Sequence, residues 1–125
     1  MKDNISIFEC GENMAEPKFD MTIYEMQAKI SKTLAHPIRL AIIHILKDGE
    51  KTVNELTETI GASQSNISQH LALLRQREIV ETRKYGSNIF YRLSTPKISQ
   101  ACDIVREVLL EQLNKKQEII KNYSL

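Results

Sequence analysis

Residues 63–93 decide the fold of this chain, and they read SQSNISQHLALLRQREIVETRKYGSNIFYRL. The first half predicts a helix: Ser63 is a suitable N-cap, and Ile67, Leu71 and Leu74 recur at intervals that place them on one face. The opposite face is polar without charge, and it consists of Ser65, Ser68, Gln69, Ala72 and Gln76. Because hydroxyl and amide groups can bond base edges and a methyl group can contact thymine, this face favours major-groove binding.

The second half of the stretch predicts a β-hairpin. Two runs rich in β-branched and aromatic residues, Val80–Lys84 and Ile89–Leu93, flank a turn at Tyr85–Asn88, where Gly86 supplies a positive φ. The basic residues of the hairpin are Arg83, Lys84 and Arg92. A neutral polar helix followed by a basic hairpin is typical of a winged helix-turn-helix, with the helix in the major groove and the wing along the backbone.

Length and composition fit one globular domain: the chain has 125 residues, of which 42% are hydrophobic and 26% charged. The net charge of +1 is unevenly distributed. Residues 63–92 contain five basic and two acidic residues, whereas residues 1–35 contain four basic and six acidic ones. No apolar run approaches the ~20 residues that span a bilayer, and no signal peptide is evident, so we expect a cytoplasmic protein without membrane contact.

The remaining segments predict further helices around this stretch. Residues 1–20 predict a flexible N-terminal arm, and residues 21–121 the folded domain. Helical spacing covers Met21–Leu34, and Pro37 to about Leu46 is apolar nearly all round, so we expect the latter to be the buried centre. Thr52 begins a capping box for a short helix that Gly61 closes, which completes a helix-turn-helix with the helix after Ser63.

A long last helix is expected from Pro96 towards Lys121. Its apolar stripe consists of Ile98, Ala101, Cys102, Val105, Val108, Leu109, Leu113, Ile119 and Ile120. Because this stripe is too broad for a small domain to cover, we expect a second subunit to cover it. The sequence thus predicts a mainly α fold with a small β-hairpin, a winged helix-turn-helix that dimerises through its first and last helices.

Three segments together resemble the ArsR/SmtB family of winged-helix repressors. Leu34–Leu40 resembles the family's second helix, Ser63–Leu71 its recognition helix and Arg83–Leu93 its wing. The resemblance covers about residues 22–121 and implies a homodimeric repressor that binds a double-stranded DNA operator of approximate two-fold symmetry. Glu78 stands where the family usually has Gly, so a positive φ there carries a conformational cost.

The candidate DNA-binding residues are Thr52, Gln64, Ser65, Ser68, Gln69, His70, Arg83, Lys84, Tyr85, Ser87 and Arg92. The alternative for the helix is a solvated surface, and for the hairpin a charged strand edge that discourages aggregation. His70 falls beside the apolar face, so a half-buried structural histidine is the alternative to a phosphate contact. A winged-helix module that binds proteins without DNA is the competing function. An enzyme is not expected, since no HExxH, Gly-rich phosphate loop or GxSxG occurs.

The resemblance also implies metal sensing, but the family's ligands are missing. Residues 55–61 contain no cysteine where the arsenic and cadmium sites have theirs. On the last helix Asp103 is followed by Val105 where the zinc site has His, and Lys115 and Lys116 occupy the later positions. His36 and His44 are a further pair, which we expect in a buried helix region. We therefore expect no metal and no cofactor.

Two cysteines are the candidate effector residues. Cys102 on an apolar stripe is typical of a small core residue, whereas Cys10 in the arm is an accessible thiol without a structural role. A Cys10–Cys102 disulfide or polysulfide bridge, and a shared soft-metal or arsenite site, are both compatible with these positions. No effector, or an unidentified one, remains the alternative.

Overall fold

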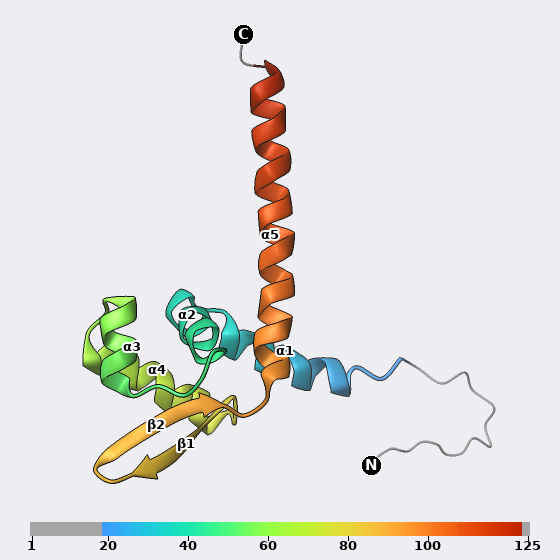
Figure 1. Cartoon of the computed structure of the whole chain (residues 1–125). Helices are drawn as coiled ribbons and strands as arrows, with labels where there is room; N and C mark the ends of the chain where they lie inside the picture. Colours follow the sequence, from blue (N-terminus) through green and yellow to red (C-terminus); the bar gives the residue numbers. More distant parts are fainter. Residues whose placement is uncertain (1–18, 124–125) are drawn as a thin grey trace, which may run out of the picture.

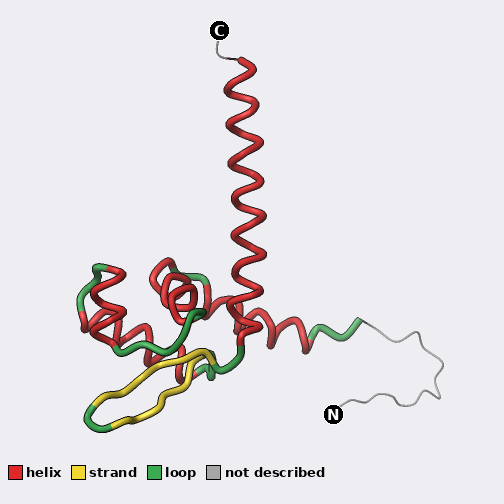
Figure 2. Tube along the Cα trace, viewed as in Figure 1, coloured by secondary structure: helices red, strands yellow, loops and turns green. Residues whose placement is uncertain are grey.

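The computed structural model describes residues 19–123, which form five helices and one two-stranded antiparallel hairpin. In chain order the elements are α1 (Thr22–Leu34), α2 (Pro37–Leu46), α3 (Val53–Ile60), α4 (Gln64–Gln76), β1 (Val80–Tyr85), β2 (Asn88–Leu93) and α5 (Pro96–Tyr123). Figure 1 shows α2, α3, α4 and the hairpin packed together, while α5 projects away from them as a long single helix. Figure 2 marks the hairpin as the strand part of a mainly helical fold, which confirms the expected fold class.

The core lies between α2, α3, α4 and the start of the hairpin. Its buried residues are Ile42, Ile43, Leu46, Leu56, Ile67, Leu71, Leu74, Ile79 and Val80. The central place of α2 is confirmed, but this helix is not buried all round, because Leu40 on its other side is 43% exposed. The elements of one chain cover only one side of this ten-residue helix.

The expected caps fix the two helices of the helix-turn-helix. Thr52 and Glu55 form a reciprocal capping box at the start of α3, and Gly61 ends this helix with a φ of +83°. The Ser63 side chain accepts a hydrogen bond from the backbone N–H of Asn66 at 3.1 Å and so caps α4. Only three residues, 61–63, separate the two helices, which fixes the angle of entry into α4.

The two strands and their turn form the wing, residues 80–93. Each strand is one residue longer than expected, because Tyr85 pairs with Asn88 and leaves Gly86 and Ser87 as a two-residue turn. Gly86 has the expected positive φ, +62°, and a two-residue turn of this kind matches the twist of paired strands. The loop before α3 joins the wing at Lys51, which exchanges two backbone hydrogen bonds with Tyr91 at 2.8 and 3.0 Å.

Glu78 has a φ of +61°, and it lies between α4 and the wing. Its own N–H donates to the carbonyl of Arg75 at 3.0 Å, and the N–H of Ile79 donates to the carbonyl of Leu74 at 2.8 Å. A side chain in the left-handed region costs about 1–2 kcal/mol. The turn between α4 and the wing is therefore strained, as expected for a residue other than glycine with a positive φ at this position.

The helices α1 and α5 expose many large apolar side chains. On α1 they include Ile23, Met26 and Ile30, and on α5 they are Ile104, Val105, Val108, Leu109, Leu110, Leu113, Ile119 and Ile120. Ile98 and Cys102 instead pack against the core of their own domain, so the expected single stripe of α5 divides in two. The division arises because α5 contacts the domain only with its first turns and then leaves it (Figure 1). No helix within residues 19–123 is long and apolar enough to cross a membrane.

Candidate nucleic-acid interface

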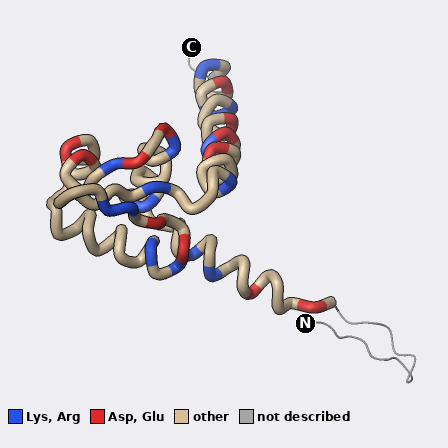
Figure 3. The backbone as a smooth tube through the Cα atoms, turned by 60° about the horizontal axis from the view of Figure 1, so that its bottom comes forward, with Lys and Arg blue, Asp and Glu red and all other residues tan. Residues whose placement is uncertain are grey.

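The outer face of α4 is exposed, polar and uncharged, as the sequence predicted. Ser65, Ser68 and Gln69 are all exposed on the side opposite the buried Ile67 and Leu71. In Figure 3 the α4 tube is free of charged residues until its last turn, where Arg75 lies. Gln64 at the start of α4 is exposed too, and Thr52 is half-buried at the start of α3. Hydroxyl and amide groups of this kind can form hydrogen bonds with base edges. Because they carry no charge, they do not add an attraction to phosphates that would be equal for every DNA sequence.

One arginine of the wing, Arg83, forms an ion pair with a residue of its own chain. Arg83 Nε donates to Glu50 Oε1 at 3.1 Å, and Arg83 Nη2 donates to the same carboxylate oxygen. The guanidinium also lies 5.6 Å from the ring centroid of Tyr85 and 5.0 Å from that of Phe90. The hydrogen bond from Arg83 lowers the pKa of Glu50. Arg83 thus braces the wing against the loop before α3, a role that the sequence did not indicate because Glu50 lies 33 residues away.

The other basic residues of the wing differ in their partners. Arg92 Nη2 bonds Glu81 Oε1 at 3.2 Å across the two strands. Lys84 is exposed and forms no ion pair within residues 19–123, and the exposed Tyr85 and Ser87 lie beside it near the turn. Lys84 is therefore the wing cation with its charge free for a phosphate.

Two histidines from different helices meet at the side of α4. The rings of His36 and His70 are tilted against each other, with centroids 4.3 Å apart. His36 is the N-cap of α2, where its Nδ1 accepts a hydrogen bond from the N–H of Ile38 at 3.1 Å. The pKa of His70 is lowered by burial first, and then by His36 and Arg39. His70 is half-buried, as expected, but its contact with His36 was not predicted, because only the packing of α2 on α4 brings the two together.

The expectation that His44 is buried is wrong. His44 is exposed because it lies on the same side of α2 as Leu40, away from the core. Its Nδ1 lies 3.1 Å from Arg106 Nη2, and Arg106 in turn donates to Asp103 Oδ1 at 2.8 Å. His36 and His44 therefore have different partners and form no pair. Among residues 19–123, no group of three or more His, Cys, Asp or Glu side chains is arranged to hold a metal ion.

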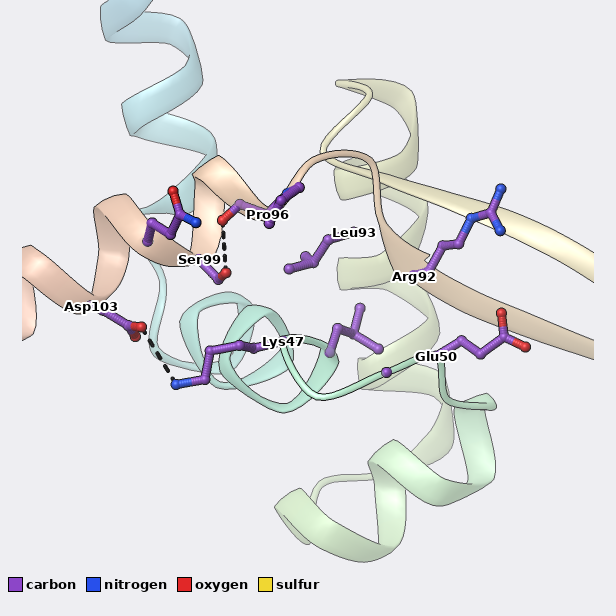
Figure 4. Close-up of a pocket in the computed structure, with 10 residues that line it drawn as sticks. Lys47, Glu50, Arg92, Leu93, Pro96, Ser99 and Asp103 are labelled. Carbon is purple, nitrogen blue, oxygen red and sulfur yellow. Dashed lines mark hydrogen bonds and ion pairs between the residues drawn. The ribbon is translucent and has the colours of Figure 1, made fainter.

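A pocket opens between the end of α2, the end of β2 and the start of α5 (Figure 4). The Lys47 ammonium and the Asp103 carboxylate point toward each other there, with Nζ and Oδ2 3.4 Å apart. The buried Ser99 donates to the carbonyl of Pro96 at 2.9 Å. Glu50 and Arg92, which also line the pocket, have the partners described above. Since its charges are paired within the chain, we assign no ligand to this pocket.

Cys102 is a free, half-buried thiol where α5 leaves the domain. Burial raises its pKa, Arg106 opposes this effect and Asp103 adds to it. A raised pKa lowers the fraction of reactive thiolate at neutral pH. Cys10 lies outside the described residues, and with it the expected contact between the two thiols.

Comparison with known proteins is decisive for the family. Residues 36–82 match the family model for bacterial regulatory proteins of the arsR family. Rv0081, an HTH-type transcriptional regulator of Mycobacterium tuberculosis, is 32% identical over 101 residues, which are 80% of this chain and 89% of that protein. The chain belongs to the arsR family. This is a family of transcriptional regulators, and the matched segment contains the motif of residues 63–71 and most of that of residues 34–40, while the wing motif of residues 83–93 lies just beyond it.

Further arsR-family relatives and solved structures share the fold. The biofilm growth-associated repressor of Xylella fastidiosa is 41% identical over 85 residues, covering 68% of this chain and 75% of that one. The crystal structure of Rv0081 matches with a TM-score of 0.68 at 33% identity and covers 82% of this chain and 98% of that one. The homodimeric winged helix-turn-helix domain Mb0332 of Mycobacterium bovis matches with a TM-score of 0.67 at 26% identity, covering 78% and 93%.

Proposed function

We propose that this protein is a homodimeric transcriptional regulator, acting as a repressor, that binds a double-stranded DNA operator of approximate two-fold symmetry. The observation that carries the proposal is the uncharged face of α4, with Ser65, Ser68 and Gln69 exposed beside a basic wing. Such a helix in the major groove reads base edges, and the wing follows the phosphate backbone.

The roles of the candidate residues follow from their places. Ser65, Ser68 and Gln69 face the bases, because they lie on the side of α4 opposite the core. The residues assigned to the phosphate backbone are Thr52, Gln64, His70, Arg83, Lys84, Tyr85, Ser87 and Arg92. Among the wing cations Lys84 makes the strongest contact, since Arg83 and Arg92 already pair with Glu50 and Glu81.

The exposed apolar faces of α1 and α5 support the dimer. Val105 is 69% exposed and Leu109 50% exposed, with other large apolar residues beside them on α5. We expect a second copy to cover both helices and bury these side chains, with the two recognition helices about one turn of DNA, ~34–36 Å, or a multiple of it apart. The homodimeric state of Mb0332, a protein of the same fold, supports a homodimer here.

The test is a selection of binding sites with the purified full chain from random duplexes, followed by titration of the recovered duplex and a scrambled version. We expect a site with two related half-sites and a preference of at least about 10³-fold at physiological salt. Analytical ultracentrifugation of the complex should give two chains per duplex. Recovery of no common sequence, together with no salt-dependent binding to any duplex, would favour the protein-interaction module.

We also propose a response to oxidants or thiophilic ligands through Cys10 and Cys102. Cys102 packs against the core from the first part of α5, the helix proposed for the dimer interface, so we expect a change at its thiol to alter the distance between the two recognition helices. The raised pKa of this thiol lowers its fraction of reactive thiolate at neutral pH. Operator titrations of wild type, Cys10→Ser and Cys102→Ser, with and without a polysulfide donor or arsenite, test this response. Equal responses of all three proteins would show that the cysteines are not the sensor.

A further inference from the structure

Three side chains with positive or titratable groups meet beside α4, and we call them the His36/Arg39/His70 cluster. The two imidazole rings are 4.3 Å apart. Arg39 lies in the first turn of α2, close enough to shift the pKa of His70, and its Nε is buried without a hydrogen-bond partner in the described chain. Buried polar groups are nearly always bonded, so an unpaired guanidinium nitrogen calls for an explanation.

The cluster contains no carboxylate to balance its charge. The elements packed against α4 are α2, α3 and β1. From α2, His36 and Arg39 face His70, whereas Glu55 and Glu58 of α3 are exposed and form no ion pair with the cluster. The charged residues of β1 are Glu81, Arg83 and Lys84, and the only one on α4 itself is Arg75 in the last turn. Among the described residues none of these carboxylates pairs with the cluster, which leaves it available to an anion from outside the chain.

Helix geometry places the cluster beside a DNA strand when α4 binds as proposed above. An α-helix with its side chains is about 10–12 Å across, and the major groove is about 12 Å wide. A helix that presents Ser65 and Gln69 to the bases must therefore lay its two sides against the two phosphate strands. His70 follows Gln69 in sequence and lies about 100° further round, on the side that contacts α2. The N-terminal end of α2, with His36 and Arg39, then lies next to one strand.

The hydrogen bonding of His36 fits a phosphate ligand. Its Nδ1 accepts the N–H of Ile38, so the neutral ring carries its proton on Nε2, which is a donor. His70 gains a second donor when it is protonated. Arg39 supplies further N–H groups on a fixed planar fork that suits phosphate oxygens.

We propose that His36, Arg39 and His70 form a phosphate-binding site, which holds one backbone phosphate of the operator and takes up a proton when it does so. The proposal rests on the proposed function and adds a site and a proton linkage to it. In the free protein burial, and then His36 and Arg39, lower the pKa of His70 and so disfavour its charged form, whereas a phosphate beside it would supply a negative charge.

The sign of the pH effect follows from this change of partner. The pKa of His70 is below its ordinary value of about 6.5 in the free protein and rises when a phosphate lies against it. A group whose pKa is higher in the complex binds protons on association, so affinity increases as the pH falls through the pKa of the complex. The increase ends below the pKa of the free protein. The affinity is therefore expected to change between the pKa of the complex and the lower pKa of the free protein.

The experiment titrates the full chain with the duplex recovered by selection at pH 8, 7 and 6 and constant ionic strength. Wild type is expected to bind at least about threefold more tightly at pH 6 than at pH 8, and one fully coupled proton gives about tenfold per pH unit. Calorimetry in two buffers of different ionisation enthalpy should show proton uptake. His70→Gln should abolish both the pH dependence and the uptake.

Two further variants separate the site from the fold. His36→Asn keeps a side chain that caps α2 but removes the ring that lowers the pKa of His70, so it should reduce the pH dependence without loss of thermal stability. His44→Gln is the matched control, because it removes the remaining histidine of the chain from the same helix at a place away from the cluster. It should retain the wild-type pH dependence.

The outcomes distinguish this inference from the proposed function. Binding of the selected duplex with a pH-independent affinity overturns the phosphate site and leaves the proposed function standing. Wild-type pH dependence in both His70→Gln and His36→Asn also overturns the site. Absence of any duplex binding by wild type at all three pH values overturns the proposed function, and this site with it.

Discussion

Arg83 in β1 and Glu50 in the loop before α3 form an ion pair in which two guanidinium nitrogens bond one carboxylate oxygen. The backbone bridge between Lys51 and Tyr91 lies next to it. Together the two contacts hold the wing at a set angle to the helix-turn-helix. The ion pair also balances the positive charge of Arg83 with a carboxylate of the same chain.

Glu50→Gln should strengthen binding to any duplex at low salt. The substitution removes a negative charge near the wing and replaces the ion pair of Arg83 with a weaker, neutral hydrogen bond, so its guanidinium is more available to a phosphate. The plot of log affinity against log salt should become steeper by about one unit for each phosphate gained. Titration of a scrambled duplex at several salt concentrations measures this slope.

One variant controls for general charge effects on this slope, and a second variant tests the contribution of the wing. Glu111→Gln makes the same charge change on the exposed surface of α5 and should leave the slope unchanged. Lys84→Ala removes a wing cation without an intramolecular partner and should make the slope shallower by about one unit. A slope that Lys84→Ala does not alter would place the wing outside the interface.

Gln69→Ala and Ser65→Ala should weaken binding to the selected duplex by about 1–3 kcal/mol each, because each removes hydrogen bonds to base edges. Binding to a scrambled duplex should hardly change. Gln100→Ala, at an exposed glutamine on α5, is the matched control and should bind like wild type. If the losses on both duplexes are equal, these side chains contact phosphates and not bases.

Glu78→Gly should stabilise the fold by roughly 1 kcal/mol. Glu78 has a φ of +61°, a conformation that costs a residue with a side chain about 1–2 kcal/mol. Glycine avoids this cost, but its greater conformational freedom in the unfolded chain offsets part of the stabilisation. Glu78→Ala removes the same carboxylate but keeps the Cβ, so its stability should stay within about 0.5 kcal/mol of wild type. Denaturant unfolding measures both; equal stability of the two variants would contradict the strain at this turn.

Val105→Asp should give a folded monomer. Val105 is exposed in the single chain, so the charge harms the monomer little, but a dimer through α5 buries it without a partner. Sedimentation measures the assembly, and circular dichroism checks the fold. Gln100→Asp adds the same charge to an exposed position of α5 and should remain dimeric. A dimeric Val105→Asp would place the interface elsewhere.

The Cys102 thiol should react slowly with iodoacetamide. Burial raises its pKa, so little thiolate is present at pH 7, and its reaction should accelerate as the pH rises. In the Cys10→Ser variant Cys102 is the remaining thiol, and mass spectrometry follows its alkylation. A free cysteine peptide is the reference, and we expect a rate at least about tenfold lower. Alkylation as fast as the peptide's would contradict the burial of this thiol.

The order of the elements and the residues of the core could be predicted from the sequence because they depend on local signals. The capping box at Thr52, the N-cap Ser63 and the turn glycine Gly86 all act within a few residues, and all three are confirmed. At Glu78 the resemblance to a family that usually has glycine there indicated a conformational cost if φ is positive, and the φ of +61° is positive. The apolar spacing of α4 fixed which face lies on the core and thereby which face is free for DNA.

Only the tertiary structure decided which residues that are far apart in the sequence contact each other. Glu50 reaches Arg83 and His36 reaches His70 because the packing of the loop on the wing, and of α2 on α4, brings them together. Periodicity assigns a side chain to a face of its own helix, but it carries no information about the element that covers this face. For the same reason the exposure of His44 was missed. Contacts between elements depend on how the whole chain packs. This packing therefore decides which charged side chains of the DNA-binding surface form ion pairs.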